Sequence, residues 1–138
     1  MKNEQFITLL KLDLAKEYSS AIQYITCAAK MTNSACSEVV EELKKKANEE
    51  IEHAMILAEQ IYILGGDPAV RVCNVLTAED NDGMLEQDLD GEKDSVTRYR
   101  TRIQQAEALR EIALAHQLRK ILAVEQTHTE ELMHTLGK

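Results

Sequence analysis

Apolar residues recur along most of the chain in alternating steps of three and four, the spacing that places side chains on one face of an α-helix. Four segments carry this pattern, and each ends where the period is interrupted or where residues occur that stop a helix. The expected helices cover approximately residues 3–31, 37–64, 82–109 and 110–136. After the second of them, Gly65 and Gly66 end the helix and Pro68 prevents it from resuming. The sequence therefore predicts an all-α protein.

The connections between these helices predict how they are arranged. Short connections join the first helix to the second and the third to the fourth, so each pair is expected to be antiparallel. Between the pairs lies a segment without helical period, residues 65–80. Extended, this segment reaches roughly 50 Å, which exceeds the roughly 40 Å length of each helix. We expect a four-helix bundle of two helical hairpins joined by a long crossover, without a fifth helix, in a single domain spanning residues 1–138.

Composition and charge agree with this architecture and narrow the function. One proline, five glycines and one phenylalanine are fewer turn and aromatic residues than a strand-rich domain needs. The net charge of −8 argues against nucleic acid or an anionic membrane as the partner, because both require a basic surface. No apolar stretch predicts a membrane span, and no signal peptide is recognisable. Three cysteines without a C-x-x-C pair favour a reducing compartment, so a cytoplasmic protein is expected.

Charged residues interrupt the apolar stripe near the middle of every helix, at positions that should face inward. Each helix has a glutamate there, and in the second and fourth helices a histidine follows three residues later on the same face. These residues are Glu17, Glu50, His53, Glu92, Glu125 and His128. A buried carboxylate without a counter-charge is costly, so either these glutamates hold protons or cations lie among them. Two divalent ions would balance four carboxylates, and carboxylate oxygen mixed with imidazole nitrogen suits iron, manganese or zinc.

An internal repeat strengthens the metal interpretation. One Glu-x-x-His pair by itself is weak evidence, because most such pairs are solvated surface residues. A shift of 75 positions, however, aligns five polar positions of the stripe at once. The aligned pairs are Asp13 with Asp88, Glu17 with Glu92, Tyr24 with Tyr99, Glu50 with Glu125, and His53 with His128. The repeat predicts two equivalent half-sites that face each other in a two-metal centre.

These residues resemble the ferritin-like superfamily, and bacterioferritin most closely, from Glu17 to His128. The motifs are K-E-Y-S-S-A-I-Q-Y around Glu17, E-I-E-H-A with Glu50 and His53, M-L-E-Q-D-L-D-G-E ending at Glu92, and E-Q-T-H with Glu125 and His128. The resemblance implies that two iron ions bind, with manganese or zinc as other possible metals. It also implies that Glu50 and Glu125 bridge both ions. Glu17 with His53 would then complete one metal position, and Glu92 with His128 the other.

Two further pairs of residues are expected to support these ligands. Tyr24 and Tyr99 lie on the ligand face, and we expect their hydroxyls to donate hydrogen bonds to the bridging carboxylates, with a backbone carbonyl as the alternative acceptor. Asp13 and Asp88 lie one turn before the glutamates of their helices. We expect them to accept the free N–H of the ligating histidines, the alternative being ordinary salt bridges.

Departures from the family pattern limit what the resemblance implies. Ile51 stands where bacterioferritin has the methionine that binds haem, and Met55 is out of register, so no haem is expected. Rubrerythrins have a further glutamate at the position of Ser95 and a C-x-x-C tail, and this chain has neither. The chain stops at Lys138 without the fifth helix of large ferritin cages, so a full cage does not follow. A homo-oligomer, at least a dimer, is expected.

The resemblance implies a ferroxidase that binds Fe(II) and oxidises it to Fe(III) with O₂ or peroxide, for iron storage or detoxification. One alternative is a rubrerythrin-like peroxidase or another di-iron or manganese redox enzyme. A second alternative is a metal-free or zinc-filled helical protein with a structural or interaction role. The sequence leaves these alternatives open.

Overall fold

The computed structural model describes residues 1–138 and contains four α-helices and no strand. The helices are α1 (Asn3–Met31), α2 (Ser37–Ile63), α3 (Asn81–Ala108) and α4 (Ile112–Thr135). The predicted all-α class and the four helices are thus confirmed. The largest difference from the predicted limits is at the start of α4, because Arg110 adopts a left-handed conformation with a φ of 61° that separates α3 from α4.

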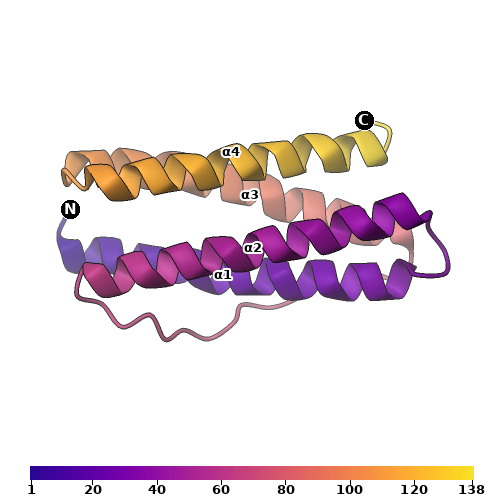
Figure 1. Ribbon diagram of the computed structural model, residues 1–138, viewed down its shortest axis with the longest axis horizontal. Coiled ribbons are helices and arrows are strands. Elements are labelled where there is room, and N and C mark those ends of the chain that lie inside the picture. Colours follow the sequence, from indigo (N-terminus) through magenta and orange to yellow (C-terminus); the bar gives the residue numbers. More distant parts are fainter.

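The helices form two antiparallel hairpins that lie against each other along their length, as predicted. Figure 1 shows α1 beside α2 and α3 beside α4, with the crossover running lengthwise outside the first hairpin. Between the hairpins, α1 packs against α3 and α2 against α4. The crossover is fastened to α1 by hydrogen bonds, since Ser19 Oγ donates to the Cys73 carbonyl at 2.9 Å and the Leu76 amide donates to Gln23 Oε1 at 3.0 Å. None of the helices is long and apolar enough to cross a membrane.

The apolar core is divided into two clusters by a polar layer. One cluster surrounds Phe6, Leu57 and Leu118, and the other surrounds Met31, Leu43 and Leu132. Burial of each large aliphatic side chain contributes about 1.5–3 kcal/mol, so the two clusters can offset the cost of desolvating the polar groups between them. The two apolar clusters hold the helices in the register that brings the polar residues together.

Candidate metal centre

The polar layer consists of the six residues that the sequence singled out. Each helix contributes one glutamate, and α2 and α4 each add a histidine one turn further on. All six side chains are buried, with at most 5% of the residue surface exposed. The residues are Glu17, Glu50, His53, Glu92, Glu125 and His128. The helical spacing therefore placed all of them on inward faces, as expected.

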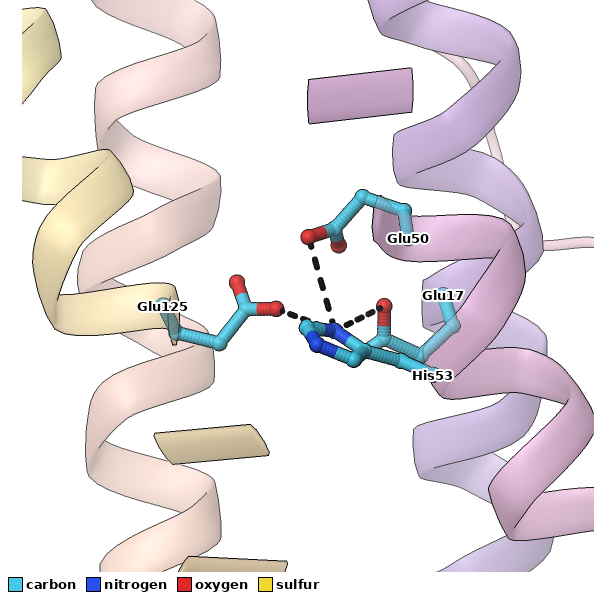
Figure 2. Close-up of side chains that lie close together, drawn as sticks. All are labelled: Glu17, Glu50, His53 and Glu125. Carbon is cyan, nitrogen blue, oxygen red and sulfur yellow. Dashed lines mark ion pairs between the residues drawn. The ribbon is translucent and has the colours of Figure 1, made fainter. Parts of the chain in front are cut away.

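One group of possible metal ligands is formed by Glu17, Glu50, His53 and Glu125, whose ligand atoms all lie within 4.8 Å of one another. Figure 2 shows the three carboxylates converging on the His53 ring from three helices. His53 Nδ1 lies 2.9 Å from Glu125 Oε1 and 3.6 Å from Glu17 Oε2. The imidazole nitrogen thus faces the same space as the carboxylates.

A second group has the same composition and overlaps the first. It consists of Glu50, Glu92, Glu125 and His128, again with ligand atoms within 4.8 Å of one another. His128 Nδ1 lies 3.2 Å from Glu50 Oε1 and 3.2 Å from Glu92 Oε1. Glu50 and Glu125 are the only residues common to both groups. Two four-ligand groups that share two carboxylates are the arrangement expected of a pair of metal ions with two bridging ligands.

Many atoms of these groups have no hydrogen-bond partner, which tests whether the residues fit a metal. Both carboxylate oxygens of Glu50 and of Glu125 are buried and unpartnered, as are one oxygen each of Glu17 and Glu92 and Nδ1 of His53. Leaving a buried polar atom unpartnered costs about 1–3 kcal/mol, so natural proteins rarely keep several in one place without a reason. The donor set of oxygen and imidazole nitrogen suits iron, manganese or zinc. The residues fit two metal ions.

The pKa values of the carboxyl groups show how the centre holds its charge without a metal. Burial, together with the charges of neighbouring glutamates, raises the pKa of Glu50 and of Glu125 well above the ordinary value. Burial also acts to raise the pKa of Glu17, but the nearby His53 imidazole and Glu50 carboxyl outweigh it, and the pKa is lowered. The two shared glutamates therefore hold a proton more tightly than an exposed glutamate does, and a bound cation would favour release of that proton.

Comparison with known proteins identifies the family of this chain. The profile of the ferritin-like domain family matches residues 7–138. The chain belongs to the ferritin-like family. A ferritin-like, diiron-carboxylate protein from Bacillus anthracis str. Ames is 33% identical and superposes with a TM-score of 0.90, over 99% of this chain and 99% of that one. The bacterioferritin of Mycobacterium tuberculosis is 24% identical, with a TM-score of 0.90 over 96% of this chain and 84% of that one. No protein of curated function matches the sequence significantly.

The tyrosines of this ferritin-like chain bond to carboxylates, but not to those expected. Tyr24 donates to Glu92 Oε1 and Tyr99 donates to Glu17 Oε1, each at 2.5 Å. The expectation that they bond to the shared glutamates is therefore wrong. Each tyrosine lies on the helix opposite its acceptor, so its hydroxyl reaches across the α1–α3 interface to the glutamate there. The bond fixes one oxygen of that glutamate and leaves the other free to bind a metal.

The expected partner of Asp13 is also wrong. Asp13 is fully buried and accepts hydrogen bonds from Arg98 Nη1 at 2.6 Å and from Arg102 Nε at 2.6 Å. Both arginines lie on α3 directly across from Asp13 on α1, and a guanidinium is long enough to reach it across the interface. The alternative of a salt bridge is the correct one for this residue.

Asp88, the repeat partner of Asp13, has no cationic partner within bonding distance and does not contact a histidine either. Its Oδ1 accepts a hydrogen bond from Gln23 Nε2 at 2.9 Å and lies 3.7 Å from Cys27 Sγ, while Oδ2 is unpartnered. Burial raises the pKa of Asp88 to about 6. The carboxylate that faces Nε2 of His128 is instead Glu49, at 3.5 Å. Sequence reasoning missed Glu49 because it lies one position outside the apolar stripe.

Lys46 was also missed. Only 2% of its surface is exposed, whereas Lys44 and Lys45 beside it are exposed. Its ammonium group lies 2.6 Å from Glu131 Oε2 on α4. The sequence spacing does not distinguish Lys46 from its exposed neighbours, because Lys46 is buried by packing against α4 and not by its place on α2.

Proposed function

We propose that the six buried residues bind two metal ions, that the native metal is iron, and that the protein is a ferroxidase that oxidises Fe(II) to Fe(III) with O₂ or peroxide. The observation that carries the proposal is the pair of overlapping ligand groups with Glu50 and Glu125 in common. Glu17 with His53 would complete one metal position, and Glu92 with His128 the other. The diiron-carboxylate nature of the Bacillus anthracis relative supports iron as the metal.

The ligand set explains why Fe(II) would give up electrons at this site. Four carboxylates attract an ion of charge +3 more strongly than one of charge +2, and burial strengthens that difference. Two ions supply one electron each, so O₂ takes up two electrons and two protons to give hydrogen peroxide. Hydrogen peroxide as oxidant would likewise take up two electrons and two protons to give two water molecules.

The residues of the chain have distinct parts in this reaction. Glu50 and Glu125 would bridge the two ions, and because burial and the neighbouring glutamates raise the pKa of both, the positive charge of a metal would favour their ionised form. Tyr24 and Tyr99 hold the outer glutamates in the orientation that leaves one oxygen free. The apolar clusters cover the polar layer on both sides along the bundle axis.

The test is anaerobic titration of metal-depleted protein with Fe(II), followed by exposure to O₂ or, in a parallel sample, to hydrogen peroxide. We expect two Fe(II) ions per chain and rapid appearance of Fe(III) absorbance, both largely lost in Glu50→Gln. Glu52→Gln, an equal change of charge at an exposed position of the same helix, should behave as the wild type. Binding that Glu50→Gln leaves intact would disprove the site, and binding without oxidation by either oxidant would disprove the activity.

Two other expectations stay predictions. We expect a homo-oligomer, at least a dimer, which light scattering of the purified protein can test. A cytoplasmic location can be tested by fractionation of the source cells.

A further inference from the structure

The two halves of the centre differ in how their outer aspartates are neutralised. In the half that contains Glu17, two guanidinium groups bind Asp13. In the half that contains Glu92, the repeat puts Gln23 and Cys27 at the positions of those two arginines, so Asp88 has only neutral partners. In one half the aspartate is therefore neutralised by two guanidinium groups. In the other half the aspartate is buried without a cationic partner, and one of its oxygens has no hydrogen-bond partner.

A surface cavity opens into the second half only. It has a volume of about 310 Å³ and lies between α1 and α3, with Cys73, Asn74 and Leu76 of the crossover at its edge. Asp88 and Glu92 both line it, whereas Asp13 and Glu17 do not. Of the six candidate metal ligands, only Glu92 lines the cavity.

The charges in this cavity favour a cation. Four carboxylates and two cationic side chains line it, a balance of −2. Both cations already have carboxylate partners, since Asp94 lies 3.1 Å from Lys16 Nζ and 2.8 Å from Arg98 Nε, and Arg98 also binds Asp13. The deeper carboxylates, Asp88 and Glu92, therefore keep their attraction for a positive ion.

Size and geometry agree with a metal ion that still carries water. Six water molecules occupy about 180 Å³ at their volume in the liquid, which the cavity can accommodate. Asp88 and Glu92 are four residues apart on α3 and so lie on the same face of the helix. Each is only 3% exposed and has one carboxylate oxygen without a partner. A cation in the cavity would therefore find two neighbouring carboxylates, those of Asp88 and Glu92.

We propose that divalent metal ions reach the centre through this cavity, and that the Asp88 carboxylate binds each ion in transit before Glu92 receives it. This inference rests on the proposed two-metal site and adds the path by which that site is filled. It predicts that the metal position of Glu92 and His128 fills before that of Glu17 and His53.

The experiment measures binding of Co(II), which has a visible absorbance and is not oxidised under these conditions, to the metal-depleted full-length protein in a stopped-flow instrument. In Asp88→Asn the binding rate should fall about 10-fold or more, since electrostatic attraction of this kind changes association rates by 10- to 1000-fold. Two Co(II) ions per chain should still be bound at the end. The control is Asp82→Asn, the same change at an exposed position at the start of α3, which should not alter the rate.

A second set of variants tests the cavity without touching a buried residue. Gly91 lines the cavity, is exposed, and a Cβ added there would meet no atom within 4 Å. Gly91→Lys should slow Co(II) binding several-fold relative to Gly91→Gln, and added salt should reduce the difference because it screens exposed charges. Both variants should fold, since replacing a glycine in a helix favours the helix.

The outcomes separate this inference from the proposed function. Two Co(II) bound at unchanged rates in Asp88→Asn and Gly91→Lys would overturn the path and leave the two-metal site standing. A final count below two in Asp88→Asn would make Asp88 a permanent ligand and overturn its transit role. Wild-type protein that binds no Co(II), or binding that Glu50→Gln leaves unchanged, would overturn both proposals.

Discussion

The substitution Glu50→Gln should have opposite effects on stability with and without metal. Glu50 is 1% exposed, and both of its carboxylate oxygens lack a hydrogen-bond partner. Without metal, an amide of the same shape removes a buried group that can ionise. With metal, the same amide removes a charged ligand that belongs to both groups. Few structural roles other than metal binding would reverse the sign of the effect.

The metal-free effect follows from proton linkage. Burial and the charges of Glu17 and Glu125 raise the pKa of Glu50 in the folded state well above 4.5. The folded state therefore holds a proton that the unfolded state has released, and stability falls as pH rises from about 4.5 towards the raised pKa. The loss is about 1.4 kcal/mol for each pH unit and each such proton. At pH 8 Glu50→Gln should be more stable than the wild type by about 1–3 kcal/mol.

The metal-bound effect follows from mass action. A ligand at 100 times its dissociation constant stabilises the folded state by about 2.7 kcal/mol, so two ions supply about 5 kcal/mol. Glu50→Gln should lose most of this gain, because a neutral amide replaces one ligand of each ion. In metal the variant should thus be less stable than the wild type by roughly 2–4 kcal/mol.

Urea unfolding followed by circular dichroism, in chelator and in excess Co(II), measures both effects. Glu52→Gln is the matched control and should change stability little in either condition. The reasoning would be refuted if Glu50→Gln were destabilised equally in both conditions, or if Co(II) stabilised the variant as much as the wild type.

Further substitutions test other parts of the centre. Asp13→Asn should destabilise the protein by about 3–5 kcal/mol in urea unfolding, because it leaves the buried guanidinium of Arg102 without its carboxylate partner. An effect below 1 kcal/mol would contradict this. Asp88→Asn should instead stabilise the metal-free protein at pH 8, by up to about 3 kcal/mol. The pKa of Asp88 is about 6 in the folded protein and 3.8 in the unfolded chain, so the wild type loses stability as the pH rises between these two values. The advantage should vanish near pH 4. Tyr99→Phe removes the hydrogen-bond donor to Glu17, a proposed metal ligand, and should weaken Co(II) binding about 10- to 100-fold in calorimetric titration. Unchanged affinity would argue against that role. Leu57→Ala should lower the free energy of unfolding by about 2–5 kcal/mol through the cavity it leaves. Two Co(II) should still be bound, because the rest of the apolar cluster keeps the helices in register, and loss of binding would contradict this.

The sequence alone determined the helices and the identity of the six candidate ligands. The period of an α-helix decides which side chains share a face, whatever that face later meets, so Glu50 and His53 had to point the same way. The repeat at 75 positions then showed that Glu125 and His128 do so in an equivalent helix. A polar residue at a position where the helical period predicts an apolar one is easily recognised in a sequence. For that reason the sequence was sufficient to predict which residues form the candidate centre.

Only the tertiary structure decided what the side chains around the centre contact. Contacts between helices depend on how far each helix is shifted along its axis and rotated about it. Long polar side chains can reach partners on a neighbouring helix over several ångströms, so the sequence does not decide which partner they contact. Tyr99 therefore reaches Glu17 of the opposite hairpin, and Lys46 is buried only because α4 covers it. The repeat paired Asp13 with Asp88 in position but not in environment, since the residues facing them on the neighbouring helices differ. For this reason two halves that look alike in sequence differ in charge, and one of them opens to a surface cavity.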